Sequence, residues 1–177
     1  MADNIFLGPQ AGLNHSLAVL RAATIKRPVL PETLLVHGVN LSCDPDVDVR
    51  GQILSEPGTL FSLHLDPQKR PRWVSLVLDM GVVDLTAPQW LALVCASQSP
   101  KAVTFRIMLR SIIDGGHVDS FFRKTVAAYS EPTTHLDALD VTLDQTVPRG
   151  PTKRELILLF EPVAQNLHLL NFGVFVA

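Results

Sequence analysis

The sequence predicts an all-β protein, folded as an antiparallel β-sandwich that follows a short N-terminal arm or helix. Three observations predict this class: the chain holds many short apolar runs, proline, glycine and aspartate separate them, and valine, isoleucine and phenylalanine enrich them. No segment of helical periodicity and helical length lies between these runs, which argues against a parallel α/β sheet. With 177 residues, of which 47% are hydrophobic and 18% charged, the chain is sufficient for one folded core.

Residues 1–33 are predicted to form the arm, and residues 34–177 are predicted to form the sandwich. Three leucines of the arm recur at helical spacing: Leu13, Leu17 and Leu20. Asn14 or Ser16 is the expected N-cap of this helix. Prolines follow shortly afterwards, and the helix cannot continue through them.

The strands are expected where the apolar runs lie, since side chains of a strand alternate between two faces and each apolar set marks the core side. The predicted strands are residues 34–39, 60–65, 73–79, 91–96, 102–113, 118–129, 139–143, 155–161 and 167–177. In the strand 102–113, Phe105 and Ile107 mark the core face, whereas Arg106 and Arg110 mark the outer face. The run at 155–160 is apolar on both faces, which is typical of a central strand that is covered on both sides.

The stretch Asp114-Gly-Gly-His117 is interpreted as a hairpin turn and not as part of a catalytic loop. A two-residue Gly-Gly turn is a strong hairpin signal, because glycine readily adopts the positive φ angles that such turns need. This register places Arg110 opposite Phe121. It also places Lys124 on the core side, so we expect a bulge or an open strand end just before it.

Composition and charge exclude several classes of partner. The formal net charge is −2, with 15 basic and 17 acidic residues that are well mixed, which argues against nucleic acid and against a basic membrane-binding face. No apolar stretch is long enough to span a membrane, and no basic start precedes an apolar leader. We therefore expect a cytoplasmic protein, with export by a route that needs no N-terminal signal as the alternative. Cys43 and Cys95 lack zinc-ligand spacing and are predicted to be buried free thiols.

One group of outward side chains is the candidate ligand-binding site. Arginine and aromatic residues of the predicted hairpin would form an outward shelf: Arg106, Arg110, Phe121, Arg123 and Tyr129. Trp73 is an outlying candidate on the non-core side of its strand. Aromatic rings stack on the apolar faces of sugars, and guanidinium groups donate to hydroxyls, carboxylates or sulfates. The alternative is an ordinary solvated strand face, in which arginine stems cover exposed aromatic rings.

A metal site is the second candidate. Asp44, Asp46 and Asp48 alternate like the first half of a calcium-binding loop. The match is incomplete, because Val49 stands where an EF-hand loop needs glycine and Ser55 stands where it needs glutamate. We therefore predict no cofactor, with calcium at these three aspartates as the alternative.

Histidine–aspartate pairs are the remaining candidate for chemistry, since two residues at i and i+2 share one face of a strand. They are His64 with Asp66, His117 with Asp119, and His135 with Asp137. The sequence contains no nucleophile elbow, zinc-protease helix, phosphate-binding loop or dinucleotide fingerprint. A hydrolase or isomerase is accordingly the weakest of the functional hypotheses.

Three segments resemble galactose-binding-like, jelly-roll β-sandwiches that serve as carbohydrate-binding modules. They are WVSLVLDMG, VTFRIMLRSIIDGGHVDSFFRKTV and RELILLFEPVAQNLHLLNFGVFVA. The resemblance implies a jelly-roll without catalytic activity. It also implies a ligand that is bound either by loops at one end or by a concave sheet face.

The sequence thus favours a non-catalytic module that binds a carbohydrate or another polyhydroxylated ligand through one sheet face or its end loops. The alternative is a structural or assembly subunit of a multi-protein particle. In that case residues 1–33 would dock on a neighbouring subunit or on a second copy of the chain, and the sandwich would serve only for packing.

Overall fold

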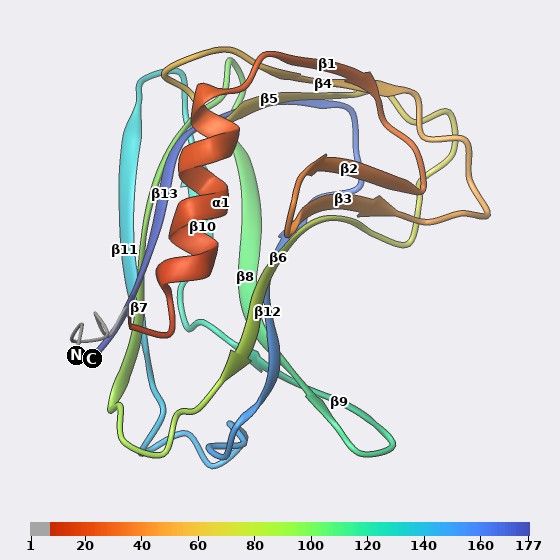
Figure 1. The fold of residues 1–177 in the computed structure, drawn as a ribbon. Coiled ribbons are helices and arrows are strands. Elements are labelled where there is room, and N and C mark those ends of the chain that lie inside the picture. The colour runs from red at the N-terminus through yellow and green to blue at the C-terminus, as the bar shows by residue number, and fades with distance from the viewer. Residues whose placement is uncertain (1–7) are drawn as a thin grey trace.

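The computed structural model describes residues 8–177 and contains two antiparallel sheets packed face to face (Figure 1). The six-stranded sheet has the order β1-β4-β5-β13-β7-β11. The seven-stranded sheet has the order β10-β8-β12-β6-β3-β2, and β9 pairs with β8 beside this path. These sheets confirm the prediction of an all-β sandwich.

The strands of the six-stranded sheet are β1 (Ile25–Pro28), β4 (Gly51–Ser55), β5 (Phe61–Leu65), β7 (Trp90–Gln98), β11 (Thr133–Asp140) and β13 (Gln165–Val176). The strands of the other sheet are β2 (Glu32–Val36), β3 (Val39–Cys43), β6 (Val74–Val83), β8 (Val103–Ile113), β9 (Gly116–Phe121), β10 (Val126–Ala128) and β12 (Thr152–Phe160). Helix α1 (Ala11–Ala22) contacts β13 of the first sheet and both β6 and β2 of the second. Within residues 8–177, no helix is long and apolar enough to cross a membrane.

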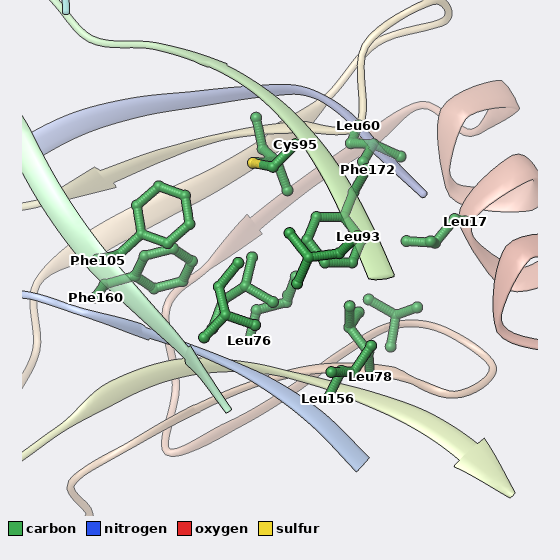
Figure 2. Packing of buried hydrophobic residues seen from close by; sticks show 14 of the residues in the cluster. Leu17, Leu60, Leu76, Leu78, Leu93, Cys95, Phe105, Leu156, Phe160 and Phe172 are labelled. Atoms are coloured by element: carbon green, nitrogen blue, oxygen red, sulfur yellow. The ribbon is translucent and has the colours of Figure 1, made fainter. Parts of the chain in front are cut away.

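The core lies between the sheets and is built from the apolar sides of alternating strands (Figure 2). Val74, Leu76 and Leu78 of β6 are buried, as the alternation predicts. The rings of Phe105 and Phe160 meet edge to face across β8 and β12, with 5.6 Å between their centroids. Complete burial of one such large apolar side chain contributes roughly 1.5–3 kcal/mol, so this interior is the main source of stability.

Helix α1 belongs to the sandwich, because the three predicted leucines all point into the common core. Figure 2 shows Leu17 entering this core from the helix. The expected cap differs from the observed one: the helix begins at Ala11, so Asn14 and Ser16 lie inside it. The Asn14 amide instead bonds the backbone of Val174, donating to its carbonyl at 2.8 Å and accepting from its N–H at 3.2 Å. These bonds occupy an edge of β13.

Several predicted strands have different bounds. The run at 34–39 is a hairpin between β2 and β3, in which Gly38 takes a positive φ of 75°. The prediction of a strand at 139–143 is wrong, because the observed strand β11 ends at Asp140 and turns follow it. β1 and β4 were not predicted, because each is short and β4 carries few strand-forming residues.

The hairpin at residue 114 is confirmed, but its register in β9 differs from the predicted one. Ile113 pairs with Gly116, so the two central residues are Asp114 and Gly115, and Gly115 alone of the pair has a positive φ. Arg110 consequently lies opposite Asp119 and not opposite Phe121. The expected interruption before Lys124 is confirmed, because β9 ends at Phe121 and β10 begins at Val126.

Candidate functional site

A groove crosses the outer face of the seven-stranded sheet, on the side away from the core. It has a volume of about 490 Å³ and extends over β9, β8, β12, β6 and β3. We call it the sheet groove, and its lining residues are Ser42, Trp73, Ser75, Val77, Met108, Arg110, Asp119, Phe121, Ile157 and Leu159. The sheet groove crosses five neighbouring strands, from β9 to β3. Because neighbouring strands lie about 4.8 Å apart, it is about 19 Å long.

The floor of the sheet groove is apolar. Phe121, Met108, Ile157 and Val77 stand directly opposite one another on four adjacent strands, so their side chains form one row across the sheet. Met108 is 4% exposed and Ile157 is 2% exposed, although neither belongs to the core between the sheets. The apolar outer side of β12 is thus the floor of a groove, and not a surface covered by another layer of the fold.

Aromatic side chains stand at two places along the sheet groove. Phe121 is the last residue of β9, and this hairpin extends away from the body of the sandwich (Figure 1). The guanidinium of Arg106 lies 4.0 Å from the centroid of the Phe121 ring, which fixes that ring by a cation–π contact. Trp73 directly precedes β6, and Arg72 lies 5.1 Å from the centroid of its ring.

The two charged residues that line the sheet groove neutralise each other. Arg110 donates from Nε and from Nη2 to the two carboxylate oxygens of Asp119, and both distances are 2.8 Å. The hydrogen bond from Arg110 lowers the pKa of Asp119, and the same bond raises the pKa of Arg110. The pair is therefore ionised over the whole range of ordinary pH, and it contributes no net charge to the groove.

The arrangement offers apolar contact and a few fixed polar groups, without net charge. Phe121 and Trp73 bring aromatic rings to the groove, while Ser42 and Ser75 add hydroxyl groups beside the apolar floor. Such a surface can hold a molecule that has flat apolar faces and hydroxyls along its edges.

The structure brings together part of the predicted shelf. Arg110, Phe121 and Trp73 line the sheet groove, and Arg106 stacks on Phe121 at its rim. Arg123 is exposed in the loop after β9 and does not line this groove. Its charge acts on Asp140 of the other sheet, where it is one of the weaker causes of a lowered pKa, after the hydrogen bond from Thr142.

Tyr129 lies in a different hollow at one end of the sandwich. This end pocket has a volume of about 430 Å³, and Lys101, Glu161 and His64 also line it. Glu161 accepts a hydrogen bond from Thr104 on β8. The predicted row of five residues on one shelf is therefore divided between the sheet groove, the end pocket and the surface.

The three aspartates of the predicted calcium loop bind arginine side chains. Asp44 is 2% exposed and accepts from the Arg72 backbone N–H, from Nε and from Nη2, at 2.8–2.9 Å. Arg72 also bonds Asp46, and Asp48 pairs with Arg50. The bonds from Arg72 hold the pKa of Asp44 well below its usual range. In residues 8–177 no group of three metal-binding side chains is gathered, so the structure gives no support to calcium at this loop.

The histidine–aspartate pairs do not form one site. His117 Nε2 lies 3.7 Å from Asp119, whose carboxylate is already bound by Arg110. His135 Nε2 is buried without a hydrogen-bond partner, and burial lowers the pKa of this imidazole. Cys43 and Cys95 are free and buried, which confirms the prediction, and burial raises the pKa of Cys95 to about 12.

Sequence reasoning missed most of the groove floor. Ile157 and Leu159 lie in the run that was apolar on both faces, and that pattern was the available signal. It was interpreted as cover on both sides, whereas one side is an open groove. Asp119 was considered only as a partner of His117, because the predicted register separated it from Arg110.

Comparison with known proteins identifies the fold. No family model matches the sequence, and no curated protein matches it either. Among solved structures, the family 11 carbohydrate-binding module of the cellulosomal cellulase Lic26A-Cel5E of Clostridium thermocellum has a TM-score of 0.56 at 12% identity, covering 84% of this chain and 96% of that chain. The CBM22-1 xylan-binding domain of Paenibacillus barcinonensis Xyn10C has a TM-score of 0.52 at 8% identity, covering 88% and 95%.

A catalytic domain shares the same fold. The xyloglucanase domain of NopAA, a type three effector from Sinorhizobium fredii, has a TM-score of 0.51 at 8% identity, covering 86% of this chain and 99% of that chain. The chain therefore has the β-sandwich fold of carbohydrate-binding modules. Because an enzyme domain has this fold too, the choice between binding and catalysis depends on the site.

Proposed function

We propose that this protein is a non-catalytic carbohydrate-binding module that holds an uncharged glycan chain in the sheet groove. One observation carries the proposal: the outer side of the central strands β8, β12 and β6 is an apolar floor between the exposed ring of Phe121 and the half-buried ring of Trp73. A concave, mostly apolar surface with a few polar groups is the usual form of a ligand site. Sugar rings stacked on Phe121 and Trp73 would cover this floor.

The shape of the sheet groove favours a chain over a single sugar. The groove runs across five strands, and the row from Phe121 to Val77 continues from strand to strand without a barrier of charged residues. Its length of about 19 Å admits several linked rings. Two structural neighbours support this assignment, one solved with a β-1,3-1,4-mixed-linked tetrasaccharide and one described as xylan-binding.

The charges of the sheet groove favour an uncharged chain. Arg110 and Asp119 cancel each other, and the remaining lining residues are apolar or carry hydroxyl groups. Moving a carboxylate or a sulfate out of water into such a groove costs free energy that no free cation on its floor would return.

Catalysis is less well supported than binding. Glycoside hydrolysis commonly uses two carboxyl groups that flank the bond to be cut. Among the residues that line the sheet groove, Asp119 is the one carboxylate, and Arg110 holds both of its oxygens.

Assembly through the N-terminal arm also lacks support. Over residues 8–33, the leucines of α1 are buried inside the chain's own sandwich, and β1 pairs with β4. The buried side of α1 is therefore already occupied within the chain itself.

Isothermal titration with the β-1,3-1,4-mixed-linked tetrasaccharide and with xylo-oligosaccharides tests the proposal. Phe121→Ala and Trp73→Ala should each weaken binding by at least about tenfold, since a central aromatic contact carries a large share of the binding energy. Phe175→Ala is the matched control, because Phe175 is an exposed aromatic residue (53%) on the six-stranded sheet.

Equal losses from Phe121→Ala and Phe175→Ala would contradict the proposal. So would the absence of binding to any uncharged glycan chain by the unaltered protein. Thermal unfolding of each variant shows whether a lost affinity reflects the groove or the stability of the fold.

A further inference from the structure

We infer that Asp119 is a specificity-determining residue, which masks the charge of Arg110 and so keeps acidic glycans out of the sheet groove. The inference rests on the proposed function and deepens it. It predicts that removal of one negative charge converts the groove into a binder of uronate-containing chains.

Asp119 is placed to neutralise Arg110 by the register of the β8–β9 hairpin. The two residues are direct cross-strand partners, so their side chains leave the sheet on the same outer side. Both Asp119 oxygens accept from the guanidinium at 2.8 Å in a bidentate pair. The same fork geometry would suit the carboxylate of a uronic acid, and Asp119 therefore occupies the place that such a ligand group would take.

The burial of the pair makes the masking effective. The Arg110 side chain is 28% exposed and that of Asp119 is 25% exposed, so water screens their attraction only in part. Both residues line the sheet groove, which places the masked guanidinium where a bound chain would pass. An incoming carboxylate would have to displace Asp119 and leave that side chain without its partner.

A second arginine stands near the masked one. Arg106 lies on the same outer face of β8, and within residues 8–177 it makes no ion pair. Its guanidinium lies on the Phe121 ring.

Glu155 of β12 is the second acidic neighbour of Arg110 and lies directly opposite it. The charge of Glu155 acts on Arg110 less strongly than that of Asp119. Glu155 does not line the sheet groove.

The test compares a mixed-linkage β-glucan with the same polymer after oxidation of its C6 hydroxyl groups to carboxylates. The unaltered protein should prefer the uncharged polymer. Asp119→Asn keeps the shape of the side chain and removes its charge, so affinity for the oxidised polymer should rise by about tenfold, the effect expected of one new charge-assisted pair. The gain should shrink as sodium chloride is raised.

Glu155→Gln is the matched control. It changes the net charge of the protein by the same amount and alters a direct neighbour of Arg110, but it leaves the Arg110–Asp119 pair intact. It should produce no comparable gain. The double variant Arg110→Gln/Asp119→Asn removes both charges and should abolish the gain that Asp119→Asn gives.

The outcomes separate the inference from the proposed function. If the unaltered protein binds neither polymer, the proposed function fails. If it binds the uncharged polymer and Asp119→Asn gains nothing for the oxidised one, the inference is overturned and the proposed function stands. An equal gain from Glu155→Gln would also overturn the inference, because net charge alone would then explain the effect. Thermal unfolding of Asp119→Asn confirms that the variant is folded.

Discussion

Arg154 is fully buried, and its guanidinium donates to four neutral oxygens. Nε donates to the Val83 carbonyl at 3.1 Å, Nη1 to the Ser111 hydroxyl at 2.5 Å, and Nη2 to the carbonyls of Pro148 and Gly150 at 2.5 and 2.9 Å. Burial lowers the pKa of this residue. Arg154 therefore ties the loop before β12 to β6 and β8, beneath the end of the seven-stranded sheet.

Arg154→Ala should lower the free energy of unfolding by about 3 kcal/mol, because several buried acceptors lose their donor at once. Arg123→Ala, which removes an exposed arginine, should change it little. Urea denaturation of both variants measures the difference. Equal stability of the two variants would show that the buried network contributes nothing.

The sequence predicted the outward direction of individual residues better than their partners. Arg106, Arg110 and Trp73 lie outside the core, as strand alternation requires. Alternation has a period of two, so it survives a register shift of two residues, whereas cross-strand pairing does not. For this reason the Arg110–Asp119 pair could not be obtained from the pattern of apolar residues.

Helix α1 shows how a single element protects an edge of the fold. Asn14 faces the backbone of β13 and satisfies both the N–H and the carbonyl of Val174, which no strand pairs on that side. Arg21 of the same helix bonds Asn171 further along β13. The helix thus takes the place of a neighbouring strand.

Asn14→Ala should lower the free energy of unfolding by about 1 kcal/mol and speed hydrogen exchange at the Val174 amide. The exposed neighbour His15 provides the control through His15→Ala. If the Val174 amide exchanges at the same rate in Asn14→Ala as in the unaltered protein, the helix does not protect this edge.

Strand β11 carries a histidine from which we expect a pH dependence of stability. His135 lies opposite Cys95, and its Nε2 has no partner within the described part of the chain. Burial lowers its pKa below 6.5, against the opposing effect of Asp137 and together with that of Lys124. The unfolded chain therefore takes up this proton more readily than the folded one, and stability falls as the pH drops below about 6.5.

The midpoint of urea unfolding should decrease between about pH 7 and about pH 5.5, and His135→Gln should reduce that decrease. His15→Gln, which alters an exposed histidine, should leave it unchanged. An equal decrease in all three proteins would assign the pH dependence to other groups.

At the scale of elements, strands with a clear apolar alternation were predicted, the short β5 among them, whereas β1, β4 and most of β11 were not. β8, β12 and β13 have several alternating apolar residues, so a local pattern defines them. β1 is an edge strand, and β4 lies between β1 and β5; both are held by these long-range pairings, which no local pattern shows. The helix was located by its leucines, but its start was not, because Gln10 makes no side-chain cap.

At the scale of the whole molecule, the fold turns one apolar face inward and leaves a second apolar strip outside. The inner faces of both sheets form the core, and the outer side of β8, β12 and β6 forms the sheet groove. The sandwich was predictable from alternation and turn residues. The groove was not, because it requires side chains from five strands to be placed side by side.

The most direct test of the central claim is a nuclear magnetic resonance titration with the β-1,3-1,4-mixed-linked tetrasaccharide. Binding in the sheet groove predicts that the Trp73 indole signal and the backbone amides around Phe121 and Ile157 shift together, while the amides around Phe175 stay in place. Shifts confined to the end pocket around Tyr129, or no shifts at saturating ligand, would contradict the claim.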